Sequence, residues 1–246
     1  MLKILFAPSE GKRSGGHFSP LNSNSLIFPE LYQKRLEVIK YYEMLVKNGS
    51  DEELKELFGL KDRQEFERYK IPFEIAPTMK AIERYDGVAY KYLKYETLSS
   101  TEQEYIDRNV ILFSNLFGPI RASDYLPDYK LKQGSSVKKL VPEKYYKENF
   151  SNSIDVLIEN DEILDLRAGF YDKFYTPKAS VTTLKFLKDG KAVSHWAKAY
   201  RGAVLQALSI HQTSSIKELL LLNIEGLSLN KIIETKKKRE VIYTIL

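Results

Sequence analysis

The sequence predicts an α/β fold, with a mixed sheet and surrounding helices. Short apolar runs of strand length alternate with longer stretches whose apolar residues recur at helical spacing. Two pairs of strand-like runs are joined by short polar turns, which indicates antiparallel neighbours. The strict β-α-β repeat of an all-parallel sheet is absent. We therefore expect residues 1–246 to form a single mixed-sheet domain without a linker or an internal repeat.

The first half of the chain should contribute two core strands and several helices. A buried strand ends at Pro8, a helix follows Pro29, and the capping-box spacing of Ser99 and Glu102 begins another helix. In chain order the expected elements are a strand at 2–7, a helix after 29, short helices at 51–58 and 62–69, a helix from 99 and a strand at 110–114.

The second half should contain the turns that make the sheet mixed. Asp189-Gly190 lies between two strand-like runs and is a strong hairpin signal. A second hairpin is expected around the basic tip Lys236–Arg239. The expected elements are a helix from 142, a strand at 163–166, a hairpin of 181–187 with 192–196, a helix at 197–210 and a hairpin of 227–233 with 240–245.

The composition excludes several classes of protein. Hydrophobic residues make up 43% of the chain, which supports a packed core, but no apolar run reaches the roughly 18 residues of a membrane span. The N-terminal apolar stretch is too short for a secretory signal and lacks a cleavage site. We expect a cytoplasmic protein that does not enter a membrane.

Thiol chemistry is excluded because the chain contains no cysteine. The three histidines, His17, His195 and His211, are widely spaced and form no metal-binding motif. We therefore expect no metal site and no cofactor.

The charge suggests a polyanionic partner if the basic residues converge. The chain has 38 basic and 33 acidic side chains, for a formal net charge of +5. In SHWAKAYRG, at residues 194–202, Lys198 and Arg201 lie three residues apart. If a helix begins near Ala197, both cations lie on one face near its N-terminus, where anions are favoured. A solvated helix face is the alternative interpretation.

Two further loops bring cations after apolar strands. The loop SEGKRSGG contributes Ser9, Lys12 and Arg13, although it lacks the spacing of a Walker A motif. Arg121, with Asp124, follows the strand at 110–114. If these strands are neighbours in the sheet, their loops lie at one edge of it and together form a phosphate-binding cleft. Its expected members are Ser9, Lys12, Arg13, Arg121, Lys198 and Arg201. A flexible loop and a local ion pair are the alternatives.

Catalytic signals are weak. Asp86 and Asp124 could form an acid/base pair, but nothing in the sequence brings them together, and no GxSxG motif surrounds a serine. The polar candidates for the cleft are Asp86, Tyr90, Asp124 and Tyr171. We assign no reaction and expect a binding protein rather than an enzyme.

Residues 51–70 form a candidate helix-hairpin-helix module. In such modules an apolar–Gly–apolar turn aims backbone N–H groups at DNA phosphates without reading bases. Gly59 and Leu60 would form the turn, and Lys61 and Arg63 would add positive charge. Because the segment is rich in acidic residues, an ordinary helical corner is the alternative.

Several motifs in order resemble the YaaA family of bacterial peroxide-stress proteins. They are PSEGK at 8–12, AIERYDGVAY at 81–90, the segment at 112–134 with Gly118, Arg121 and Asp124, Tyr171, and SHWAKAYRG. The PSEGK form departs from the SPAK of another branch, because Glu10 stands where that branch has lysine.

The resemblance implies a single α/β domain, a helix-hairpin-helix module and a basic cleft that binds DNA. It also implies a role in limiting oxidative DNA damage and free iron. We expect duplex or branched DNA to be bound largely without sequence preference. The alternative is an enzyme that acts on a nucleotide or another small phosphorylated molecule in the same cleft.

Overall fold

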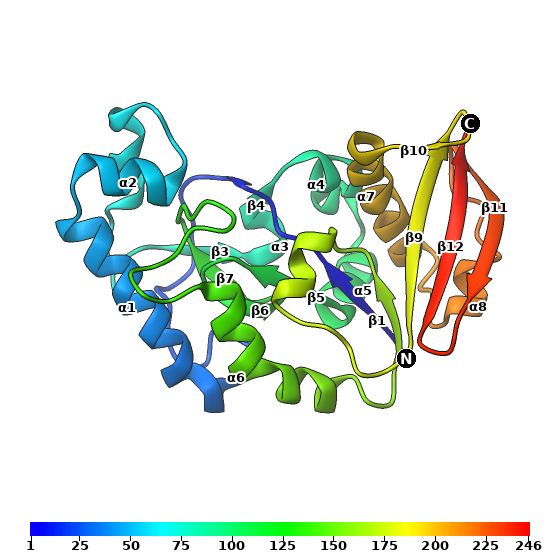
Figure 1. Cartoon of the computed structure of the whole chain (residues 1–246), viewed down its shortest axis with the longest axis horizontal. Coiled ribbons are helices and arrows are strands. Elements are labelled where there is room, and N and C mark those ends of the chain that lie inside the picture. Colours follow the sequence, from blue (N-terminus) through cyan, green and yellow to red (C-terminus); the bar gives the residue numbers. More distant parts are fainter.

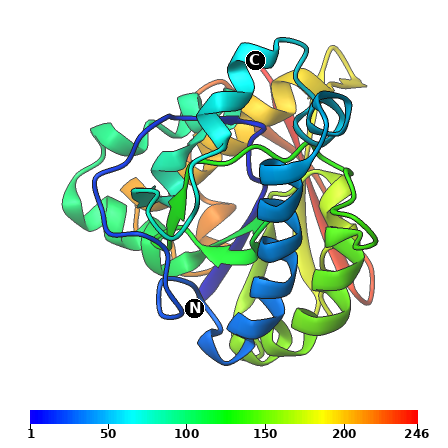
Figure 2. The same ribbon diagram turned by 90° about the vertical axis from the view of Figure 1, so that its left-hand side faces the viewer.

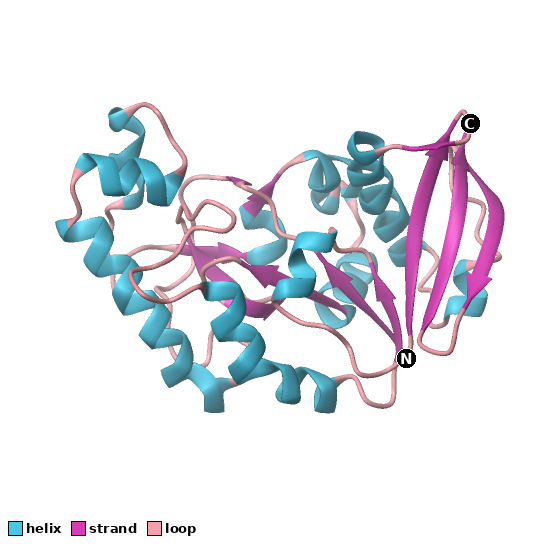
Figure 3. Cartoon of the chain, in the orientation of Figure 1, coloured by secondary structure: helices cyan, strands magenta, loops and turns pink.

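The computed structural model describes residues 1–246, apart from the side chain of His195. Its centre is an eight-stranded sheet with the order β11-β12-β9-β8-β1-β5-β6, and β10 pairs with β9 (Figures 1 and 3). The inner strands β12, β9, β8, β1 and β5 are parallel. They span Lys238–Ile245, Val181–Lys188, Glu162–Asp165, Leu2–Phe6 and Val110–Ser114.

Antiparallel strands close the edges of this sheet. β6 (Gly118–Arg121) pairs with β5, β11 (Leu227–Glu234) with β12, and β10 (Lys191–Ala192) with β9. The turn between β9 and β10 places Asp189 and Gly190 at φ values of 50° and 74°, which Asp-Gly turns adopt readily. The mixed α/β sheet and both expected hairpins are confirmed.

The core surrounds β1 and β5, which are apolar except for Lys3 and Ser114, as expected for strands with helices on both sides of the sheet. Every residue of β5 is buried. Ile4 of β1 stands opposite Val110 of β5 and Leu164 of β8. In Figure 2, α1 (Tyr32–Asn48) and α6 (Pro142–Leu157) lie on one side of the sheet, and α4 (Val88–Leu93) and α5 (Ser100–Asn109) lie on the other.

The remaining helices are short, except for α7. On the second side, α7 packs against α4 and α5. The α-helices other than α1 and α6 are α2 (Asp51–Phe58), α3 (Ala81–Arg84), α4 (Val88–Leu93), α5 (Ser100–Asn109), α7 (Ser194–Ile210) and α8 (Ile216–Leu219). The 3-10 helices are η1 (Pro29–Leu31), η2 (Arg63–Tyr69), η3 (Tyr95–Thr97) and η4 (Gly169–Lys173). None of the described helices has the length and apolarity needed to cross a membrane.

Two small ladders fasten the loops that follow β1 and precede α4. β2 (Gly11–Lys12) pairs with β4 (Tyr85–Asp86), and β3 (Thr78–Lys80) pairs with β7 (Tyr125–Pro127). The loop after the first strand is therefore held by backbone hydrogen bonds rather than being a free glycine-rich loop.

The structure does not confirm the helix-hairpin-helix module. Ser50, not Asp51, caps α2, in a capping box with Glu53. Gly59 ends α2 in the left-handed conformation, as a helix C-terminus favours. The following segment is the 3-10 helix η2 and not a second α-helix.

Helix α7 begins three residues before the expected Ala197, at Ser194. The strand expected at 192–196 is correspondingly short, because β10 ends at Ala192. The unpaired N–H groups of a helix belong to its first turn. Lys198 and Arg201 lie beyond this turn of α7.

Candidate functional site

The strand order creates a crevice at the carboxyl ends of β1 and β8. These strands are neighbours, but the chain leaving β1 leads to β5 on one side, and the chain leaving β8 leads to β9 on the other. The two loops therefore diverge. Open α/β sheets bind their ligands at such a topological switch point.

A cleft of about 500 Å³ occupies this position. The loop after β1, the start of α4, the segment after β8 and the face of α7 line it. Of the predicted site residues it collects Ser9, Asp86, Tyr90, Tyr171, Lys198 and Arg201. We call it the switch-point cleft.

The close packing of α4 on α7 fixes one wall of the cleft. A Cβ on Gly202 would lie 1.9 Å from the carbonyl oxygen of Ala89, so no larger residue fits without moving a backbone. Because Arg201 precedes Gly202, this contact holds Arg201 beside the start of α4. The glycine of SHWAKAYRG therefore has a packing role.

Ser9 joins the loop after β1 to the turn before α4. Its hydroxyl donates a hydrogen bond of 2.7 Å to the carbonyl oxygen of Asp86. A Cβ on Gly87 would lie 2.3 Å from the same hydroxyl oxygen, which explains the glycine after Asp86. Ser9 thus shapes the cleft through the backbone, while Asp86 is exposed at its rim.

The two cations of α7 have no partner among the described side chains of the cleft. The side chains of Lys198 and Arg201 form no hydrogen bond or ion pair with any residue whose side chain the structure describes. Burial lowers the pKa of Arg201, and the charge of Asp165 offsets this only in part. A partly buried guanidinium without a hydrogen bond or ion pair to a described residue is an arrangement that a bound anion would complete.

The two tyrosines have different roles. Tyr90 is buried and donates a hydrogen bond of 3.0 Å to the carbonyl oxygen of Ala7, which anchors α4 to the end of β1. Tyr171 is also buried, and burial raises its pKa. Its hydroxyl has no hydrogen bond to a described residue and lines the cleft, so it can donate to a ligand.

Arg167 positions the segment that carries Tyr171, and sequence reasoning missed it. Its guanidinium lies 2.9 and 2.7 Å from the two carboxylate oxygens of Asp165. It also donates to the carbonyl oxygens of Tyr171 and Tyr175, at 3.1 and 3.0 Å. An aspartate and an arginine two residues apart, directly after an apolar strand, were the available signal.

The structure does not place Lys12 in the cleft. Its ammonium lies 4.2 Å from the centre of the Tyr129 ring and 5.4 Å from that of Tyr85, and donates to the carbonyl oxygen of Ser9 at 3.3 Å. The Tyr129 hydroxyl is hydrogen-bonded to those of Tyr85 and Ser114, at 2.9 and 2.7 Å. Burial, followed by the charge of Lys130, lowers the pKa of Lys12 to about 7.

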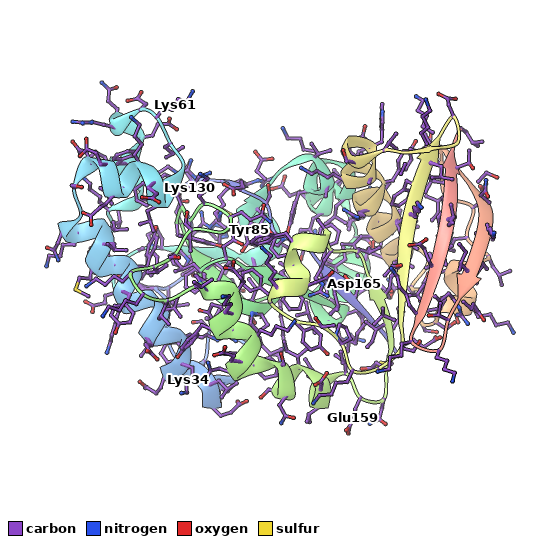
Figure 4. The ribbon with its side chains drawn as sticks, in the orientation of Figure 1. Lys34, Lys61, Tyr85, Lys130, Glu159 and Asp165 are labelled. Carbon is purple, nitrogen blue, oxygen red and sulfur yellow. The ribbon has the colours of Figure 1, made fainter. Side chains whose placement is uncertain are left out.

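Glu10 and Arg13 are both engaged with neighbouring residues. Glu10 accepts hydrogen bonds from the backbone N–H of Gln133 at 2.8 Å and from Lys130 Nζ at 3.3 Å, so a cation and a backbone dipole compensate its charge. Arg13 pairs with Glu96 on the surface. In Figure 4, Lys130 and Tyr85 lie between the α2 end of the molecule and Asp165.

Arg121 and Asp124 lie away from the switch-point cleft. Because β6 runs antiparallel to β5, the chain returns after Ser114 and places Arg121 opposite Ile111, towards the start of β5. Asp124 is buried, and its carboxylate accepts hydrogen bonds from the backbone N–H groups of Ile27 and Arg121, at 2.8 and 2.9 Å. Asp124 therefore organises a loop and does not line the cleft with Asp86.

The turn at Gly59 is not arranged to donate to phosphate. Its backbone N–H is already bonded to the carbonyl oxygen of Lys55 at 2.9 Å. Arg63 pairs with Asp51 and Glu52, and Leu60 is partly buried. Lys61 is exposed, and Figure 4 places it at the far upper end of the molecule from Asp165.

Comparison with known proteins identifies the family. A family model described as peroxide stress protein YaaA matches residues 2–232. The chain belongs to the YaaA family. The resemblance inferred from the motifs is thereby confirmed, and the matched residues include every element that lines the switch-point cleft.

Relatives in this YaaA family extend over most or all of the chain. An uncharacterized protein of Campylobacter jejuni is 48% identical over 245 residues, which cover all of both chains. A UPF0246 protein of Corynebacterium glutamicum is 35% identical and covers 85% of each chain. A UPF0246 protein of Fusobacterium nucleatum is 26% identical and covers 96% of each.

Metal-ligating side chains do not cluster in the described part of this YaaA-family protein. No group of three or more His, Asp or Glu residues that could hold a metal ion occurs among the described side chains. The groups that line the cleft include two cations, the side chain of Tyr171 and the exposed carboxylates of Glu10 and Asp86.

Proposed function

We propose that this protein binds DNA through phosphate contacts in the switch-point cleft, as part of the peroxide stress response. The observation that carries the proposal is the pair Lys198 and Arg201, which lack described protein partners and lie in a concave site. The family description supports the stress response. The proposed limitation of oxidative DNA damage and free iron rests on the family resemblance.

The number of cations in the cleft limits the number of DNA phosphates that the protein can neutralise there. With two cations in place, log K for DNA should fall against log salt with a slope of about −1.8. The slope is smaller than four convergent cations would give, because Lys12 contacts tyrosines and Arg121 lies elsewhere. Binding by phosphate contacts alone should show little preference between sequences.

The test is binding of a short DNA duplex, and of a branched DNA of the same length, measured by fluorescence anisotropy across a salt series. Arg201→Gln and Lys198→Gln should each weaken binding and reduce the slope by about 1. Lys236→Gln is the matched control, because it removes an exposed cation from the distant β11–β12 tip. If the slope of log K against log salt is the same in the unsubstituted protein and in all three variants, the assignment of DNA to the cleft is overturned.

A second candidate is an enzyme that acts on a nucleotide or another small phosphorylated molecule. Two observations favour it. The cleft lies at a topological switch point, and Tyr171, whose hydroxyl has no hydrogen bond to a described residue, lines it together with two cations. A mononucleotide should then raise the melting temperature saturably, as expected for a ligand that binds only the folded state. Saturable stabilisation that Arg201→Gln abolishes, without any binding of DNA, would favour this candidate.

A further inference from the structure

A second cationic hollow lies at the edge of the sheet opposite the switch-point cleft. It has a volume of about 470 Å³ and is lined by Lys3, Arg108 and Arg121, with apolar walls that include Ile111 and Leu157. We call it the edge hollow. Arg121, which the family motif highlighted and the cleft did not use, is one of its members.

Three separate elements deliver the cations. Lys3 belongs to β1, Arg108 to the last turn of α5, and Arg121 to the end of β6. The antiparallel return of β6 brings Arg121 back towards the start of β5. The fold therefore brings Lys3 together with two arginines that lie more than a hundred positions later in the sequence.

The positive charges in the edge hollow are only weakly compensated. Lys3 Nζ donates to the carbonyl oxygen of Arg108 at 3.1 Å, whereas the guanidinium groups of Arg108 and Arg121 have no described side-chain or backbone acceptor. Burial lowers the pKa of Lys3. The charge of Asp161 raises it, and those of Arg121 and Arg108 lower it further.

Most nearby carboxylates are committed elsewhere. Asp107 accepts from Lys80 Nζ at 2.7 Å and from the Tyr95 hydroxyl at 2.9 Å. Asp161 pairs with the N-terminal amine at 2.8 Å, and Asp124 accepts from backbone N–H groups. Glu104 also lines the hollow and is exposed to solvent. The hollow is thus lined by two exposed arginines without a described acceptor and a partly buried ammonium, together with Glu104 and the paired Asp107.

We propose that the edge hollow is a second anion site, in which Lys3, Arg108 and Arg121 bind a phosphate group. Guanidinium groups suit this ligand because their N–H donors match phosphate oxygens in pairs. The phosphate can belong to a small molecule or to a nucleic-acid backbone. Lys3 of the edge hollow and Phe6 of the switch-point cleft lie three residues apart in β1, about 10 Å along the strand, so one phosphate cannot occupy both sites.

The experiment is a titration of the whole protein with inorganic pyrophosphate at constant ionic strength, followed through backbone amide NMR shifts. We expect two saturable groups of shifts, one around Lys3 and Arg121 and one around Lys198 and Arg201. Arg121→Gln should weaken the first group about tenfold and leave the second unchanged, and Arg201→Gln should do the reverse. Arg108→Gln provides a second variant for the edge hollow.

Lys139→Gln removes an exposed cation outside both sites and is the control for net charge. A short DNA duplex then distinguishes the source of the phosphate. Displacement of pyrophosphate from the edge hollow assigns the site to a nucleic-acid backbone, and persistence of pyrophosphate assigns it to a small molecule. The proposal is overturned if shifts around Lys3 and Arg121 are absent, or if Arg121→Gln and Arg108→Gln both titrate like the control. The Arg201→Gln variant tests the switch-point cleft separately. If pyrophosphate does not bind in the edge hollow, the proposed function of the switch-point cleft is therefore unaffected.

Discussion

The Cα of Gly202 in α7 lies so close to the carbonyl group of Ala89 in α4 that the two helices share a contact with no room for a side chain. A Cβ at this position would lie 1.9 Å from the oxygen. The contact fixes the distance between the cations of α7 and the loop that begins α4. It thereby sets the width of the switch-point cleft.

Gly202→Ala should destabilise the protein by about 1–3 kcal/mol, because α4 and α7 must separate to admit the methyl group. Chemical denaturation measures the loss. Gly169→Ala is the matched control, because no atom lies within 4 Å of its Cβ position and its φ is not in the left-handed region. Equal free energies of unfolding for the two variants would show that α7 shifts at no cost.

Arg201→Gln should keep or raise the free energy of unfolding while it weakens anion binding. The substitution removes a partly buried charge that has no described partner, and such a charge costs stability in the absence of a ligand. Thermal unfolding without added anion, compared with unfolding in pyrophosphate, measures both effects. A large loss of stability without anion would indicate that Arg201 has a structural role instead.

Lys12 should make the stability depend on pH. Its pKa is lowered from 10.5 to about 7, so between these values the unfolded chain binds more protons than the folded protein does. The free energy of unfolding should therefore rise between about pH 7 and pH 10.5, with a slope approaching 1.4 kcal/mol per pH unit.

Lys12→Met keeps the length of the side chain and removes its charge, so this contribution to the pH slope should disappear. Urea denaturation at several pH values compares the two proteins. Contact with the face of the Tyr129 ring favours the charged form of Lys12, whereas burial favours its neutral form. An unchanged slope in Lys12→Met would mean that the aromatic contact prevails and that Lys12 stays charged.

Arg167→Gln should cost about 3–5 kcal/mol, because it removes the buried guanidinium that compensates the charge of Asp165 and donates to two backbone carbonyl groups. The comparison is Arg63→Gln, which breaks an exposed pair and should cost no more than about 1 kcal/mol. Denaturation curves of both variants suffice. A small loss for Arg167→Gln would show that water replaces its hydrogen bonds.

The sheet was predictable because local signals and long-range packing agree. Leu2–Phe6 and Val110–Ser114 are apolar runs of strand length. Asp189 and Gly190 both adopt positive φ values, which an Asp-Gly pair favours in a hairpin turn. The 3-10 form of η2 was not predictable in the same way. Its apolar positions Phe66 and Tyr69 lie three residues apart, which suits an α-helix as well as a 3-10 helix.

The cleft was predictable only in part. Lys198, Arg201 and Ser9 follow strands that the sheet places at one edge, as the sequence suggests. Arg121 also follows a strand, but β6 (Gly118–Arg121) pairs with that strand in the antiparallel direction and carries Arg121 back to the other edge. Lys12 was misplaced for a related reason, because its direction depends on the pairing of β2 with β4, more than seventy residues later.

The position of β12 has a consequence for synthesis of the protein. β11 precedes β12 in the chain but lies outside it in the sheet, and its exposed side chains leave it little else to pack against. While the ribosome is making the chain, β11 therefore has no strand to pair with until β12 has emerged. The sheet can be completed on this side only when β12 docks against β9.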